Sequence, residues 1–170
     1  MEEKTLALPN VTTILKIFLP ALSFSIPFIF SGPQIITGSV VNSLLIVGSF
    51  KLSKKTLWPT IVLPSIGAVL HGVVFGPFTP FLVFFLPWIW LGNFVLVSSF
   101  SAFKKTFPYP LTLIVSSVLK TTVLYSFALI YFHFNLIPKL FLSSMGIFQL
   151  FTAISGGILA YILLKTFKNG

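Results

Sequence analysis

The sequence predicts an all-α integral membrane protein: a bundle of six transmembrane helices, some of them kinked, with both termini in the cytoplasm. Three observations predict this class, namely the composition, the length of the apolar segments and the placement of the lysines. Of 170 residues, 56% are hydrophobic and 8% are charged, whereas soluble domains carry about 25% charged residues. Too few polar side chains remain to cover a surface that faces water, which excludes a soluble domain, a disordered chain and a coiled coil.

Six apolar segments have the length of membrane-crossing helices, because about 17–25 helical residues span a hydrocarbon core of about 30 Å. They are residues 11–30, 34–50, 57–75, 81–101, 110–133 and 140–164. Their continuous apolar character excludes the short alternating strands of a membrane β-barrel. Short connections make successive helices antiparallel neighbours. Without a linker or a repeat, residues 1–170 are expected to form a single transmembrane domain.

Prolines interrupt three of these segments. The first segment, 11–30, contains Pro20 and Pro27 and has no obvious cleavage site, so we expect it to remain as a helix and not to be removed as a signal peptide. Pro64 lies in the third segment and Pro87 in the fourth. Because proline lacks a backbone N–H and clashes with the preceding turn, we expect a kink or a break at each of the four.

The placement of the lysines predicts the orientation. All eleven basic residues are lysines. Six antiparallel helices would put eight of them on one side of the membrane: Lys4, Lys51, Lys54, Lys55, Lys104, Lys105, Lys165 and Lys168. Only Lys139 would lie on the other side. Since lysines collect on the cytoplasmic side, both termini are expected to be cytoplasmic, in the inner (plasma) membrane. We therefore interpret the net charge of +9 as membrane anchoring and expect no nucleic-acid partner.

The near absence of acidic residues excludes several kinds of chemistry. The two acids are Glu2 and Glu3, and no carboxylate side chain follows Lys4. Catalysis by paired carboxylates, Asp-dependent triads and carboxylate metal sites are therefore excluded. The chain has no cysteine, only two isolated histidines and no Walker A sequence. We expect no metal, no cofactor and no enzymatic activity.

Lys120 is the most unusual residue because it lies in the middle of the fifth segment. About ten residues separate it from either end, which puts it roughly 15 Å deep at 1.5 Å per residue. Its side chain is too short to reach the headgroups easily, and no acid exists at that depth to pair with it. Four states remain open for this lysine: deprotonated, bonded to backbone carbonyls, solvated in a cavity, or paired with a bound anion.

Other polar and aromatic side chains are expected between the membrane midplane and the outer surface. They are Asn42, His71, Trp88, Trp90, Asn93, Tyr125 and Gln149. Together with Lys120 they predict a pocket that opens to the outside, because intramembrane polar residues face protein or water. Each Asn or Gln could instead be a contact between helices, and the tryptophans could be ordinary interfacial residues.

Two pairs of small residues permit close approach of helices. Ala21 and Ser25 form one pair in the first segment, and Gly156 and Ala160 form the other in the sixth. Such pairs pack either within a bundle or against a partner protein.

Two stretches of the sequence resemble a known family. Residues 37–45 read TGSVVNSLL and residues 87–97 read PWIWLGNFVLV. They are similar to the TGxxVNxLL stretch in helix 2 and the PxIxLGNxxLV stretch in helix 4 of small bacterial membrane proteins. Those proteins are grouped with the substrate-binding S components of energy-coupling factor (ECF) transporters. The resemblance covers about residues 32–100.

This resemblance implies a six-helix bundle that captures a vitamin-like or other small solute from outside. The bundle would dock on a transmembrane coupling subunit that is driven by two ATPase subunits. S components often dock through an Ala-xxx-Ala face on helix 1, where this sequence has Ala21-xxx-Ser25. The implied pocket is built largely from helices 4–6 and the outer loops. By location alone, the matching residues here are Trp88, Trp90, Asn93, Lys120, Tyr125 and Gln149.

The leading hypothesis is therefore a solute-binding subunit of an ECF-type importer. A single deep lysine without a carboxylate favours a neutral or anionic solute over a cation. Lys120 would pair with an anion, and Asn42, Asn93 and Gln149 would form hydrogen bonds. Trp88 and Trp90 would form the walls. The alternative is a non-catalytic structural or assembly subunit of a larger membrane complex, in which the polar residues would meet partner helices.

Overall fold

The structure is a computed structural model that describes residues 11–30, 33–73 and 75–166. Within these ranges every regular element is helical. The elements are α1 (Val11–Ile29), α2 (Gln34–Lys51), α3 (Lys54–His71), the 3₁₀ helix η1 (Gly76–Phe81), α4 (Leu82–Phe103), α5 (Tyr109–His133), α6 (Leu140–Met145) and α7 (Ile147–Thr166). The all-α prediction is confirmed.

Five helical stretches in the described residues are long and apolar enough to cross a membrane. They are Thr12–Ile29, Gln34–Lys51, Gly76–Phe103, Tyr109–His133 and Leu140–Thr166. The third predicted segment also forms a helix of 18 residues, α3, but that helix contains two lysines, two prolines and a histidine. It is not apolar enough to be one of the five.

The prolines do not break their helices. Uninterrupted helices contain all four of the prolines at which we expected a kink or a break: Pro20, Pro27, Pro64 and Pro87. Proline removes one backbone hydrogen bond, but the turns on both sides keep theirs, so a packed helix can continue through it.

The helix break lies instead at Gly146, between α6 and α7. The prediction of a single helix over residues 140–164 is wrong at this point. Gly146 has φ −98° and ψ −106°, far from helical values. A β-carbon there would lie 2.7 Å from the carbonyl oxygen of Leu142 and 2.9 Å from the ring of Tyr125. The backbone therefore turns where only glycine fits.

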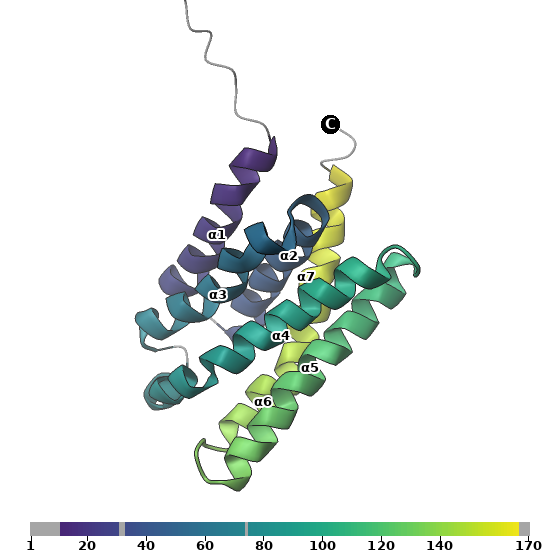
Figure 1. The fold of residues 1–170 in the computed structure, drawn as a ribbon. Helices are drawn as coiled ribbons and strands as arrows, with labels where there is room; N and C mark the ends of the chain where they lie inside the picture. The colour runs from purple at the N-terminus through teal and green to yellow at the C-terminus, as the bar shows by residue number, and fades with distance from the viewer. Residues whose placement is uncertain (1–10, 31–32, 74, 167–170) are drawn as a thin grey trace, which may run out of the picture.

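Successive long helices run in opposite directions along the bundle (Figure 1). The most extensive contacts pair α2 with α7 and α1 with α3, which are parallel pairs, and α4 with α5, which is antiparallel. Hydrogen bonds join the helices near both ends of the bundle. Lys104 Nζ donates to the carbonyl of Ser49 at one end, and Gln34 Nε2 donates to the carbonyl of Ser144 toward the other. The start of α1 and the end of α7 lie at the same end of the molecule.

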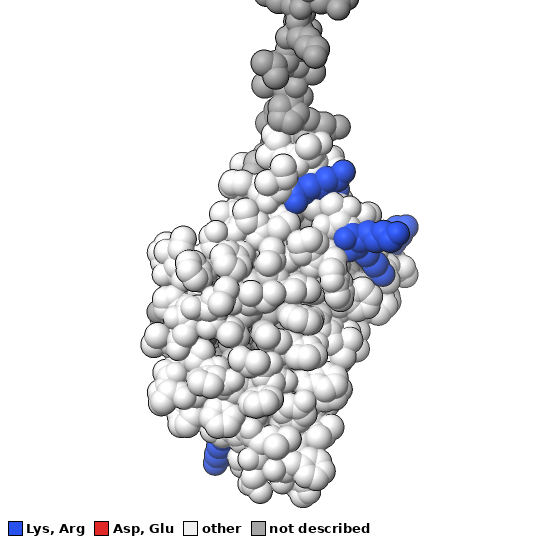
Figure 2. Space-filling model, turned by 60° about the vertical axis from the view of Figure 1, so that its left-hand side comes forward, with Lys and Arg blue, Asp and Glu red and all other residues white. Residues whose placement is uncertain are grey.

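Lysines gather at the end where α1 begins, which we call the lysine-rich end. Figure 2 shows blue side chains near that end of the visible face and one lysine far away, near the opposite end. Six described lysines lie in the first or last turn of a helix at the lysine-rich end, or just beyond it: Lys51, Lys54, Lys55, Lys104, Lys105 and Lys165. Lys16 lies in the second turn of α1. Lys139 precedes α6 at the opposite end. Lys4 and Lys168 lie outside the described residues.

The molecule is apolar outside and polar in its centre. Large apolar side chains are exposed on the long helices, as with Ile17, Phe84 and Ile162, which are 72%, 62% and 55% exposed. Polar side chains lie inside, including Asn42 and Asn93, which are almost fully buried. Lipid can cover exposed apolar surface that water cannot. This distribution fits a multi-pass membrane protein.

Two apolar clusters form the core, one toward each end. Leu45, Ile61 and Phe100 belong to the cluster nearer the lysine-rich end. Phe85 and Phe141 belong to the cluster nearer the opposite end. The buried polar residues of α2, α4 and α5 lie between them, at mid-height in the bundle.

Candidate functional site

Lys120 lies in the middle of α5 and is only 3% exposed. Its Nζ donates to Asn42 Oδ1 over 2.6 Å and to Asn93 Oδ1 over 2.9 Å. An ammonium group has three N–H donors, so one remains without a partner among the described residues. Its two partners are neutral amides, and among the described residues there is no carboxylate side chain to pair with it.

The two asparagines are themselves fixed by neighbouring helices. Asn42 Nδ2 donates to Thr152 Oγ1 over 3.2 Å, and Asn93 Nδ2 donates to the carbonyl of Ile61 over 3.0 Å. Because the ammonium only donates, each amide must present its oxygen to Lys120 and its nitrogen to the outer partner. The resulting network joins α2, α3, α4, α5 and α7.

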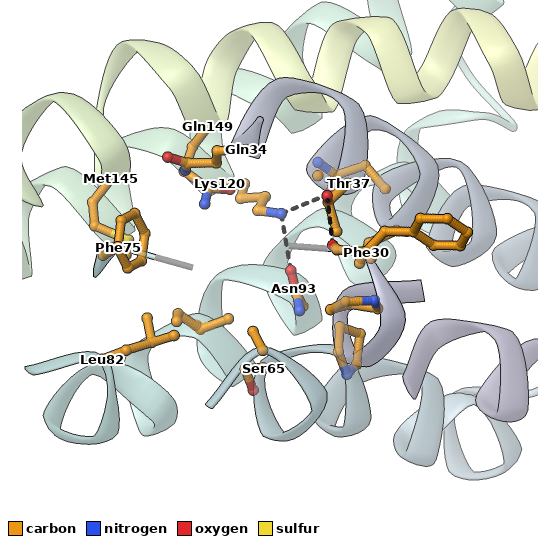
Figure 3. A pocket seen from close by; sticks show the side chains of 17 residues that line it. Phe30, Gln34, Thr37, Ser65, Phe75, Leu82, Asn93, Lys120, Met145 and Gln149 are labelled. Carbon is orange, nitrogen blue, oxygen red and sulfur yellow. Dashed lines mark hydrogen bonds between the residues drawn. The ribbon is translucent and has the colours of Figure 1, made fainter. Parts of the chain in front are cut away.

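A cavity of about 110 Å³ lies next to this network (Figure 3). Its polar lining includes Asn42, Asn93, Lys120 and Gln149. Its apolar lining includes Phe30, Phe75, Leu82 and Met145, which come from the ends of helices or the segments just beyond them. In Figure 3, Phe75, Leu82 and Met145 lie together, to one side of Lys120. The cavity thus extends from the middle of the bundle toward the end opposite the lysines.

Gln149 and Gln34 both line this cavity but differ in their bonding. Gln34 Nε2 donates to the carbonyl of Ser144. The amide of Gln149 forms no hydrogen bond with the described residues and is half-buried. We did not select Gln34 from the sequence, although its spacing from Gly38 and Asn42 is the i, i+4, i+8 pattern of one helix face. That spacing is the signal that could have identified it.

The tryptophans of α4 do not line the cavity. Trp88 Nε1 donates to the hydroxyl of Tyr131. Trp90 Nε1 donates to Ser65 Oγ over 2.8 Å, and Ser65 does line the cavity. Ile89 and Asn93 occupy the lining face of α4. Residues directly before and after Ile89 point about 100° to either side of it, so the two tryptophans flank this face.

Tyr125 and His71 also lie away from Lys120. Tyr125 lines a second, separate groove of about 500 Å³ between α5 and the α6–α7 segment, together with Thr122 and Gly146. His71 Nδ1 donates to the carbonyl of Phe28 over 2.7 Å and so joins the end of α3 to α1. Of the eight predicted binding residues, the structure brings four to one cavity: Asn42, Asn93, Lys120 and Gln149.

The two small-residue pairs have different surroundings. Gly156 and Ala160 are buried, and Gly156 packs directly on the backbone of α2 near Ser39. This pair is therefore used for packing within the bundle and is not a surface for a partner. On α1, Ala21 is exposed and Ser25 is half-buried. Of the two pairs, the one on α1 is accessible.

Lys104, at the lysine-rich end, is held by contacts with the end of α2. Its Nζ donates to the carbonyl of Ser49 over 2.6 Å and lies 4.2 Å from the centre of the Phe50 ring. Burial, and to a smaller extent the charge of Lys105, lowers the pKa of Lys104 below its usual value. It shares with Lys120 the bonding of an ammonium to neutral oxygens, but it lies outside the membrane-spanning stretch of α4.

In the part of the chain that the structure describes, no three His, Cys, Asp or Glu side chains come together as metal ligands. No protein-family model, curated protein or solved structure shows significant similarity to the chain.

Proposed function

We propose that this chain is the membrane-embedded solute-binding subunit of an ECF-type importer, which captures a small neutral or anionic solute from outside the cell. In this proposal the chain spans the plasma membrane six times, with α3 as the additional span. The lysine-rich end faces the cytoplasm, in agreement with the distribution of lysines around bacterial membrane helices.

The observation that carries the proposal is the burial of Lys120 beside a cavity, with only neutral hydrogen-bond partners among the described residues. A buried ammonium without a carboxylate is costly in a membrane unless something compensates its charge. Here it lies beside a cavity, and one N–H donor has no partner among the described residues. A bound acceptor in the cavity would complete its hydrogen bonding, and an anion would also balance its charge.

The cavity supports an outward-facing site for a small solute. Its apolar side is formed by residues near the end opposite the lysines, such as Phe30 and Phe75. That end is the extracellular one in our proposal. The cavity of about 110 Å³ is smaller than the roughly 300–1,000 Å³ of pockets for drug-sized ligands. The proposed solute is therefore smaller than most vitamins.

Coupling to partner subunits is the part of the proposal that rests on the two sequence motifs. The partners would be one transmembrane coupling subunit and two ATPase subunits. The exposed face of α1 around Ala21 is the docking surface that this proposal uses. The inward position of Lys120 and of its two amide partners supports solute binding over the assembly-subunit alternative, which would turn polar groups outward.

Native mass spectrometry of protein purified gently from its own membranes tests the proposal. We expect a co-purified small molecule, or a complex that contains two ATPase subunits and a second membrane subunit. A chain that carries neither would contradict the importer proposal.

The role of Lys120 is tested by replacing it with methionine, which has a similar length and no charge. Lys120→Met should weaken binding of an anionic solute by about tenfold or more, since a hydrogen bond to a charged group contributes about 1.5–3 kcal/mol. Lys104→Met is the matched control, because it removes a second lysine that is hydrogen-bonded to a neutral oxygen but lies far from the cavity. Equal affinity of the two variants for the solute would rule out the proposed role of Lys120.

A further inference from the structure

Resting on the function proposed above, we propose that the cavity beside Lys120 binds a monocarboxylate with a short apolar chain. The carboxylate lies against Lys120 and Gln149, and the chain points toward Phe75, Leu82 and Met145.

The charge of the site fits a single negative charge. Among the described residues that line the cavity, Lys120 is the only one with an ionisable side chain. A monoanion balances the single positive charge of a protonated Lys120. A dianion would leave one negative charge uncompensated away from water, which is strongly unfavourable. A neutral solute would leave the ammonium itself uncompensated. A monoanion is therefore the charge state that the lining favours.

The donors of the site fit a carboxylate head. The third N–H of Lys120 and the amide of Gln149 have no partners among the described residues, and both residues line the cavity. In Figure 3, Gln149 and Asn93 lie on different sides of Lys120, and the two asparagine oxygens occupy the side toward which its nitrogen points. A carboxylate has two acceptor oxygens, so it can accept from the ammonium with one and from the amide with the other.

The apolar lining fits a short chain attached to that head. Met145, Phe75 and Leu82 form an apolar wall on the side of the cavity that leads to the outer end. A bare anion such as chloride would leave this wall without contacts. Each methylene that leaves water for such a wall strengthens binding about fourfold. A cavity of about 150 Å³ holds benzene, which has six non-hydrogen atoms, so the 110 Å³ here encloses about four or five non-hydrogen atoms. That is the carboxylate with about one or two chain carbons, and a longer chain continues along the apolar wall.

Ligand-observed NMR with the full chain in nanodiscs of uncharged lipid tests this assignment, with butanoate as the probe. We expect butanoate to bind at least tenfold more tightly than butanamide, and about fifteenfold more tightly than acetate because of its two additional methylenes. Chloride and phosphate should not displace butanoate at equal concentrations. Displacement by chloride would overturn the proposal in favour of a site for bare anions.

Variants at Gln149 provide the second arm of the test, because its amide has no hydrogen-bond partner among the described residues. Gln149→Glu places a carboxylate of the protein beside Lys120 and should weaken butanoate binding at least tenfold more than the matched variant Gln149→Met does. In Lys120→Met the preference for butanoate over butanamide should disappear. Unchanged butanoate binding in Gln149→Glu, or an unchanged preference in Lys120→Met, would overturn the assignment.

The outcomes separate this assignment from the importer proposal. Equal binding of butanoate and butanamide overturns the carboxylate assignment, yet it leaves a solute-binding cavity. Absence of butanoate binding also overturns the assignment. The importer proposal fails only when native mass spectrometry finds neither a solute nor an ATPase-containing complex.

Discussion

Replacing Gly156 with valine tests the closest helix contact in the bundle, that between α7 and α2. A β-carbon at position 156 would lie 2.5 Å from the carbonyl oxygen of Ser39, 2.7 Å from the β-carbon of Asn42 and 2.9 Å from the amide nitrogen of Ser43. Ordinary contacts begin at 3.4 Å. Two of these three atoms belong to backbone, so α7 must move away from α2. Asn42, which holds Lys120, would move with that contact.

The expected loss of stability follows from two opposing effects. Overpacking costs about 1–3 kcal/mol, while valine is about 0.4 kcal/mol better than glycine within a helix. The net loss is about 0.6–2.6 kcal/mol. For a chain of this length each kcal/mol corresponds to about 2–4 °C, so Tm should fall by roughly 1–10 °C.

Thermal unfolding in detergent, followed by tryptophan fluorescence, measures this change. Leu159→Val is the matched control, because it introduces the same residue on the exposed face of α7, where Leu159 is 42% exposed. Its effect should stay within about 0.5 kcal/mol. If Gly156→Val unfolds at the same temperature as Leu159→Val, α2 and α7 do not approach as closely as described.

Three further changes have defined outcomes. Tyr109→Phe removes the hydrogen bond from the Tyr109 hydroxyl to the carbonyl of Gly157, and should lower the free energy of unfolding by about 0.5–1.5 kcal/mol in denaturant titrations. Asn93→Leu leaves the Lys120 ammonium with one acceptor and should cost about 1.5–3 kcal/mol; adding Lys120→Met should cost less than the sum of the single changes, and simple additivity would contradict the bond. Because burial lowers the pKa of Lys104 from 10.5, the unfolded state binds its proton more tightly than the folded state does. The free energy of unfolding should therefore rise as pH increases through the folded-state pKa toward 10.5, and Lys104→Met should flatten this rise in a pH series.

Most helix boundaries could be predicted from hydropathy because the apolar segments are bounded by polar or charged residues. The segment predicted over 57–75 is an exception: the helix covers Lys54–His71 and ends before Gly72, which has φ +83°. The helix over Tyr109–His133 differs by one residue from the predicted segment 110–133. The break at Gly146 could not be predicted in this way, because it depends on the close approach of the Tyr125 ring from another helix. We predicted kinks or breaks at prolines instead, because proline removes a backbone hydrogen bond within its own helix.

The convergence of Lys120, Asn42 and Asn93 was predictable in part. Each was identified as a polar residue near the membrane midplane, and depth alone brings such residues to one level. The sequence did not show in which direction each side chain points around the axis of its helix. On α4 it separates Asn93, which faces inward, from Trp88 and Trp90, which flank the inward face. Hydropathy does not show which face of α4 points inward, because apolar residues occur on all faces of this helix.

The hydrogen bonds of Lys120 also bear on the order in which the chain enters the bilayer during synthesis. Both of its acceptors belong to earlier parts of the chain, Asn42 on α2 and Asn93 on α4. When α5 emerges from the ribosome, the two amides are already available. Lys120 can therefore form its hydrogen bonds to Asn42 and Asn93 as α5 enters the bilayer. Thr152, which accepts a hydrogen bond from Asn42, lies on α7 and is synthesised after them.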